Sequence, residues 1–80
     1  MKINSEIALE CAEEAVAFDA NNAHLRDTLG FVRMQFARNS EEQLRHARED
    51  FLEAGRLDPS LTSAYKNLSE VDGRLKSLQK

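Results

Sequence analysis

Residues 29–59, LGFVRMQFARNSEEQLRHAREDFLEAGRLDP, decide the fold of this chain. Within this stretch Gly30 and Ala54 are small, whereas Leu29 and Phe51 are large and apolar. Two helices pack closely when small residues let the backbones approach and large apolar side chains fill the space beside them. The stretch ends in a proline, which cannot continue a helix. It therefore predicts a helix-turn-helix unit.

The spacing of apolar residues predicts an all-α chain with four helices. Three glycines and one proline are too few turn residues for a sheet protein of this length. Asn22 and Ser40 are suitable N-caps for the second and third helices, and Gln43 follows Ser40 at capping-box spacing. The expected helices span about 5–18, about 23–37, 40 to 57 or 58, and from 61 or 62 onward.

An internal repeat relates the first half of the chain to the second. Residues 14–20, EAVAFDA, align with residues 53–59, EAGRLDP, at an offset of 39. The same offset aligns two further pairs, Ala8 with Ala47 and Leu29 with Leu68. A period shared by all four expected helices indicates a repeat architecture.

The Leu-Gly pair at 29–30, the Ala-x-x-x-Phe pattern at 47–51 and the closing Pro59 resemble the tetratricopeptide repeat (TPR) family. The family repeat is about 34 residues, so this unit is about five residues longer, and we place the extra residues near 37–42. The resemblance implies antiparallel helical hairpins in a superhelical array, with half a repeat, one full repeat and another half. It implies a single domain at 1–80, either alone or as a segment of a longer array.

The chain departs from the family pattern on both sides of its middle unit. Arg26 and Arg33 stand where the family has large aromatic residues. Ala12 stands in place of the usual Phe, Ala20 in place of the closing Pro, and Ser69 in place of the usual Gly.

The resemblance implies a non-catalytic scaffold for protein–protein interaction, whose first helices line a groove for a segment of a partner protein. The implied groove residues are His24, Asp27, Thr28, Phe31, Met34 and Gln35, with Ser63, Lys66, Asn67, Glu70 and Arg74 from the last helix. Phe31 and Met34 are the best apolar anchors, since an aromatic ring beside a flexible thioether suits an apolar side chain of a peptide. The alternative is that both pack in the core.

One subset of the family clamps a C-terminal carboxylate with lysines, asparagines and an arginine. Lys66 and Asn67 suit such a clamp, but the second helix offers Asp27 and Thr28 at the matching places. We therefore do not expect a carboxylate clamp.

A second interpretation is a self-association module, which forms a homodimer or joins copies of a larger protein, because both ends are half repeats. Four apolar residues could make the contact: Ile3, Ile7, Leu75 and Leu78. Residues 1–19 hold one basic and five acidic residues, whereas residues 59–80 hold four basic and two acidic ones, which favours head-to-tail stacking or an antiparallel pair. Alternatively, the two leucines fold back on the third helix. A plain four-helix bundle is the remote alternative.

The sequence shows no pattern for catalysis, a cofactor or a metal site. Cys11 lies between Ala8 and Ala15 on an alanine-rich helix face, so we expect a small core residue and not a nucleophile. His46 and Asp50 have the i, i+4 spacing of some metal pairs, but they lack a third ligand, and we expect a solvated pair. We find no glycine-rich phosphate loop and no Ser-His-Asp set.

Charge and cysteine content narrow the expected partners and compartment. Eleven basic against fourteen acidic residues give a net charge of −3, which argues against binding to nucleic acid phosphates. No apolar run approaches the length that spans a membrane. The single cysteine excludes an internal disulfide and fits a reducing compartment, so we expect a cytoplasmic chain with protein partners.

Overall fold

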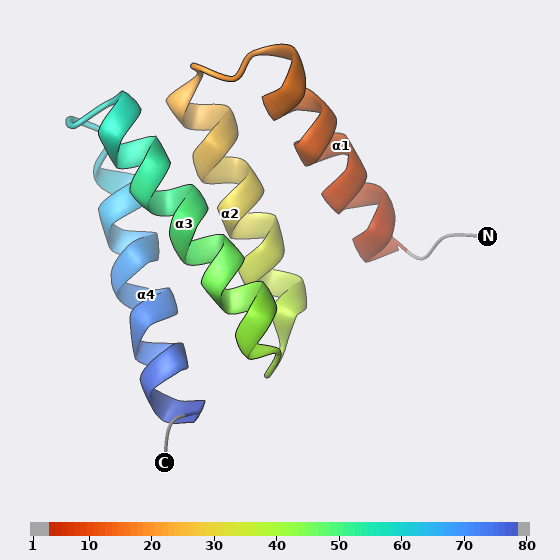
Figure 1. Cartoon of the computed structure of the whole chain (residues 1–80), viewed down its shortest axis with the longest axis vertical. Helices are drawn as coiled ribbons and strands as arrows, with labels where there is room; N and C mark the ends of the chain where they lie inside the picture. The colour runs from red at the N-terminus through yellow and green to blue at the C-terminus, as the bar shows by residue number, and fades with distance from the viewer. Residues whose placement is uncertain (1–3, 79–80) are drawn as a thin grey trace.

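The computed structural model describes residues 4–78, which form four helices: α1 (Asn4–Phe18), α2 (Ala23–Ala37), α3 (Glu41–Leu57) and α4 (Thr62–Leu78) (Figure 1). This part of the chain contains no strand, so the expected all-α class is confirmed. The observed helix bounds agree with the expected bounds to within about one residue.

The expected caps fix the starts of α2 and α3. The side-chain oxygen of Asn22 accepts a hydrogen bond from the backbone N–H of Leu25 at 3.2 Å. The hydroxyl of Ser40 accepts one from the backbone N–H of Gln43 at 3.4 Å. Each bond satisfies an amide that a helix N-terminus leaves without an intrahelical partner. Both caps predicted from the sequence are confirmed.

The helices lie in a row and alternate in direction, so that α2 and α4 run parallel (Figure 1). α3 packs against both α2 and α4, and α2 also contacts α4. α1 packs against α2 and makes no close backbone contact with α3 or α4 within the described residues. The row is flat, with Cα extents of 38 × 38 × 15 Å. The four helices therefore do not close into the plain bundle considered as an alternative.

The core lies between α2, α3 and α4. It consists of Met34, Ala37, Leu44, Ala47, Phe51, Val71 and Leu75, with Leu68 packed against it. From α1, only Ala12 is a buried apolar residue among those that the structure describes. Three helices thus share one core, and α1 is attached along its edge.

The apolar residues expected at a contact between two copies lie in different environments. Leu75 is a core residue, so its assignment to an open self-association surface is wrong and the alternative of packing inward holds for it. Leu78 and Ile7 are exposed. Ile3 lies outside the described residues.

α2 and α3 approach each other closely at Gly30. A Cβ atom on this residue would lie 2.7 Å from Cε1 of Phe51 and 3.0 Å from Cβ of Asp50. Real Cβ atoms do not come this close to a buried ring, so the contact between α2 and α3 requires glycine here. Gly73 of α4, in contrast, has open space around its Cβ position.

The two glycines give a matched pair of variants. Gly30→Ala is expected to lower the free energy of unfolding by about 2 kcal/mol, because the added methyl group overpacks the α2–α3 contact. Gly73→Ala is expected to raise it by about 0.5–1 kcal/mol, because alanine favours a helix and meets nothing. Urea unfolding followed by circular dichroism measures both values. Similar effects of the two substitutions would contradict the close approach at Gly30.

Candidate functional site

The expected groove corresponds to an exposed surface along α2 and α4. We call it the α2–α4 face and define it by five exposed residues, which are His24, Phe31 and Gln35 of α2 with Lys66 and Glu70 of α4. Thr28 and Ser63, also expected in the groove, are exposed as well. Phe31 is 42% exposed and is the large apolar side chain of this surface. The remaining four residues are polar or charged. The face therefore presents one aromatic ring within a polar border.

Met34, the other expected anchor, does not belong to this face. Its side chain is fully buried in the core with Leu44 and Val71. The expectation that Met34 lines an accessible groove is wrong, because the contact of α2 with both α3 and α4 encloses this position.

Asp27 and Asn67 form the polar floor of the α2–α4 face. The Asp27 carboxylate accepts hydrogen bonds from the Ser63 hydroxyl at 2.7 Å and from the Asn67 side-chain amide at 3.1 Å. These bonds join α2 to α4 near the start of both helices. The bond to Asp27 also engages the side-chain amide of Asn67, which was one of the two residues suited to a carboxylate clamp, with Lys66.

Arg74 joins the other end of the two helices. Its guanidinium donates to the backbone carbonyl of Met34 at 2.9 Å and to that of Arg38 at 3.5 Å. These carbonyls belong to the last turn of α2, where helix C-termini leave acceptors unpaired and favour positive charge. Side-chain hydrogen bonds therefore join α2 to α4 at both ends of the α2–α4 face.

A buried ionic cluster, which the sequence did not reveal, lies between α2 and α3. Asp50 is fully buried, and its two carboxylate oxygens accept from Arg26 Nε and from an Arg33 terminal nitrogen, each at 2.8 Å. Arg33 also binds the Glu13 carboxylate of α1 at 3.2 Å. The expectation that His46 and Asp50 form a solvated pair is therefore wrong. The available signal was the pair of arginines at positions where the family has large aromatics.

Burial controls the ionisation of Asp50. Desolvation raises the pKa of its carboxyl group above the ordinary value, and the charges and hydrogen bonds of Arg33 and Arg26 offset this rise only in part. Because both carboxylate oxygens are engaged and no solvent reaches them, this group has no free position for a substrate or a metal ion. We assign the cluster a structural role.

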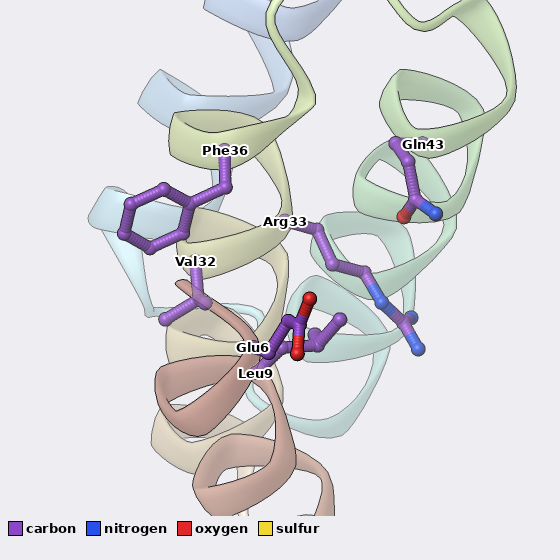
Figure 2. A pocket seen from close by; sticks show the side chains of 6 residues that line it. All are labelled: Glu6, Leu9, Val32, Arg33, Phe36 and Gln43. Atoms are coloured by element: carbon purple, nitrogen blue, oxygen red, sulfur yellow. The ribbon is translucent and has the colours of Figure 1, made fainter. Parts of the chain in front are cut away.

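A second candidate surface is a hollow of about 170 Å³ between α1, α2 and α3, with apolar and polar lining residues. Its lining consists of Glu6, Leu9, Val32, Arg33, Phe36 and Gln43 (Figure 2). In Figure 2, Val32 and Phe36 stand together on α2, and Arg33 extends toward α3. Phe36 is 52% exposed. The hollow is smaller than pockets for small-molecule ligands, which are typically about 300 Å³ or more, and has room for a single side chain.

The remaining chemically reactive residues do not converge. Cys11 is exposed, so its expected place in the core is wrong. His46 lies 3.9 Å from Glu42 on the surface of α3. Among the described residues, no three His, Cys, Asp or Glu side chains gather where they could hold a metal ion.

None of the four described helices combines the length and the apolarity that crossing a bilayer requires. Comparisons with protein-family models, curated proteins and solved structures give no match for this chain. What the chain does has to follow from its own residues.

The Asp50 cluster leads to a prediction about stability and pH. The double variant Arg26→Met with Arg33→Met leaves a buried carboxylate without a cation, and it is expected to lose about 3–5 kcal/mol of unfolding free energy at neutral pH. The pKa of Asp50 in the folded state is then raised further, so the folded protein binds a proton more readily than the unfolded chain. The loss should therefore shrink as the pH falls through that raised pKa.

Urea unfolding between pH 7 and pH 4 measures this dependence. As a control, adding Asp50→Leu to the double variant removes the buried charge and should restore most of the stability at neutral pH. A double variant within about 1 kcal/mol of the original chain would show that the arginines do not neutralise Asp50.

Proposed function

We propose that this chain is a non-catalytic, TPR-like scaffold that binds a segment of a partner protein on the α2–α4 face. In this proposal α2 and α4 are the first helices of successive repeats, and α1 and α3 are second helices. The partner segment lies along the face and contacts Phe31.

The exposed ring of Phe31 is the observation that carries the proposal. Phe31 lies outside the core cluster and retains 42% of its exposure on a surface whose other side chains are polar. An aromatic residue in such a place is a typical energetic centre of a protein interface. The packing of α2 and α4 does not otherwise account for it.

The spacing of the bonds between α2 and α4 also supports the proposal. Ser63 and Asn67 bond to Asp27 across 36 and 40 residues, and Arg74 bonds to Met34 across 40. These separations bracket the offset of 39 that aligns the two halves of the sequence. Helices that are equivalent in the repeat therefore lie side by side and parallel, as in stacked repeat proteins.

The border of the face indicates the chemistry of the partner. Gln35 offers an amide, and Lys66 and Glu70 offer charges of both signs, whereas Asp27 and Asn67 are already bonded to each other. The face suits a segment with one large apolar side chain for Phe31 and polar or charged residues on either side of it.

The same proposal takes the chain to be cytosolic and without catalysis. The buried ionisable group, Asp50, is bonded by two arginines and has no reacting partner. The single Cys11 fits a reducing compartment, because it cannot form an internal disulfide.

Selection of peptides from a random displayed library on the 80-residue chain tests the proposal. The dissociation constant of each selected peptide is then measured against the original chain, Phe31→Ala and Phe36→Ala. We expect Phe31→Ala to weaken binding about tenfold or more, since loss of an aromatic anchor is costly. We expect Phe36→Ala to change it less than about twofold.

Phe36→Ala is a matched control, because it removes an equally exposed ring from the same helix on another side. Both variants should keep the circular dichroism spectrum and the unfolding midpoint of the original chain. Peptides that lose affinity for Phe36→Ala instead would move the binding site to the hollow. Unfolding of Phe31→Ala would show that the ring is needed for the fold.

A further inference from the structure

α1 and α4, the two outer helices of the row, each leave a face uncovered. On α1 this face carries Ile7, Cys11 and Phe18, all exposed, and Phe18 is 94% exposed. These three residues lie on one side of the helix, since 7, 11 and 18 are separated by one and then two turns. Fully exposed phenylalanine on an ordered helix indicates a missing packing partner.

The uncovered face of α4 has a different character. Its exposed residues are Thr62, Ser69, Gly73 and Lys76, and the half-exposed ring of Tyr65 lies beside them. Thr62, Ser69 and Gly73 are small and lie seven and four positions apart on one side of the helix, so they leave a shallow surface against which another helix can lie closely.

The internal repeat indicates which kind of helix would cover the open face of α4. Subtracting 39 from Ser69, Gly73 and Lys76 gives the equivalent residues of α2, which are Gly30, Met34 and Ala37. All three equivalents are buried, with Gly30 against Phe51 of α3 and the other two in the core shared with α3. α4 therefore lacks the helix that α3 provides for α2.

The same comparison shows what normally covers α1. Adding 39 to Cys11 and Ala15 gives Asp50 and Ala54 of α3, both fully buried. Cys11 is exposed, in contrast. α1 is thus equivalent to α3 and lacks the helix that α2 provides for α3. The two open faces are the two halves of one repeat contact.

We propose that α4 of one molecule packs against α1 of a second copy as α2 packs against α3, so that two copies together complete one repeat. This inference rests on the repeat arrangement in the proposed function, but it does not require a ligand on the α2–α4 face. The contact joins different surfaces of the two copies, so it builds an open head-to-tail row.

Charge supports a second copy as the partner. α1 carries Glu6, Glu10, Glu13 and Glu14, whereas α4 carries Lys66, Arg74 and Lys76 against two acidic residues. In an antiparallel pairing like that of α2 with α3, the end of α4 meets the start of α1. The basic end of α4 then lies near the acidic first half of α1 in the next copy. If α1 of one copy met α1 of another copy, the two acidic helices would repel each other.

The repeat comparison places one pair of residues closely enough for a chemical test. A Cβ atom on Gly30 would lie 3.0 Å from Cβ of Asp50. Their equivalents across the proposed contact are Ser69 of one copy and Cys11 of the next. Ser69 carries a Cβ atom where α2 has a glycine, so α4 and α1 must lie slightly further apart at this point than α2 and α3 do. A disulfide needs Cβ atoms about 3.5–4.5 Å apart, and this slightly wider contact allows a cysteine at position 69 to bond to Cys11 of the neighbour.

Ser69→Cys in the full chain, oxidised with a copper–phenanthroline catalyst and run on a non-reducing gel, tests the contact. We expect a ladder of dimers, trimers and longer products that form at least tenfold faster than the products of Thr28→Cys. Thr28 is an exposed residue on α2, outside both open faces, and it controls for random collisions. Ser69→Cys with Cys11→Ser should form dimers at most. An internal disulfide is ruled out, because α1 and α4 make no contact within one chain.

Sedimentation of the original chain gives a second readout without any cysteine chemistry. Its average mass should rise with concentration, and Lys76→Glu should weaken this rise about threefold or more. Equal rates for Ser69→Cys and Thr28→Cys, products that stop at two chains, or a monomer at every concentration would each overturn the head-to-tail contact. Phe31→Ala should leave the ladder unchanged, so a failure of the peptide-binding proposal is distinguishable from a failure of this one.

Discussion

The rest of this structure depends on the neutralisation of one buried carboxylate, that of Asp50. Its charge lies at the point where α2 comes closest to α3, because Gly30 opposes it. Arg26 and Arg33, two turns apart on α2, bond to it from both sides. An unpaired charge there would cost several kcal/mol, so a rotation or register of α2 that moved both arginines away from the carboxylate is disfavoured. Arg33 extends the constraint to α1 through Glu13.

Local signals in the sequence were sufficient for the helices, and tertiary contacts decided where prediction failed. The side-chain oxygens of Asn22 and Ser40 act on amides three residues away, so the starts of α2 and α3 were predictable. Met34 was assigned to the wrong environment, because α2 touches all three other helices and its buried residues do not form a simple stripe. Asp50 was expected in solvent, since periodicity identifies apolar faces and cannot find a carboxylate whose partners are far along the chain.

The surfaces of the chain differ according to how firmly their edges are held. The α2–α4 face is held at both ends by Asp27 and Arg74, so the backbone that carries its aromatic ring is tied to both helices. The open faces of α1 and α4 have no such ties across them. Exposed aromatic rings mark both kinds of surface, but a rigid face selects a ligand by shape, whereas an open helix face needs a whole helix to cover it.

The attachment of α1 at the edge of the core has a consequence for how the molecule opens. Of the described α1 residues, only Ala12 is a buried apolar residue, whereas α2, α3 and α4 share the main cluster. Local unfolding free energy follows the buried contacts that are lost, so α1 is the segment that separates most easily while the other three helices keep their core. The protein is in this sense two cooperative units, a three-helix body and a single-helix arm. The bond from Arg33 to Glu13 couples the arm to the body.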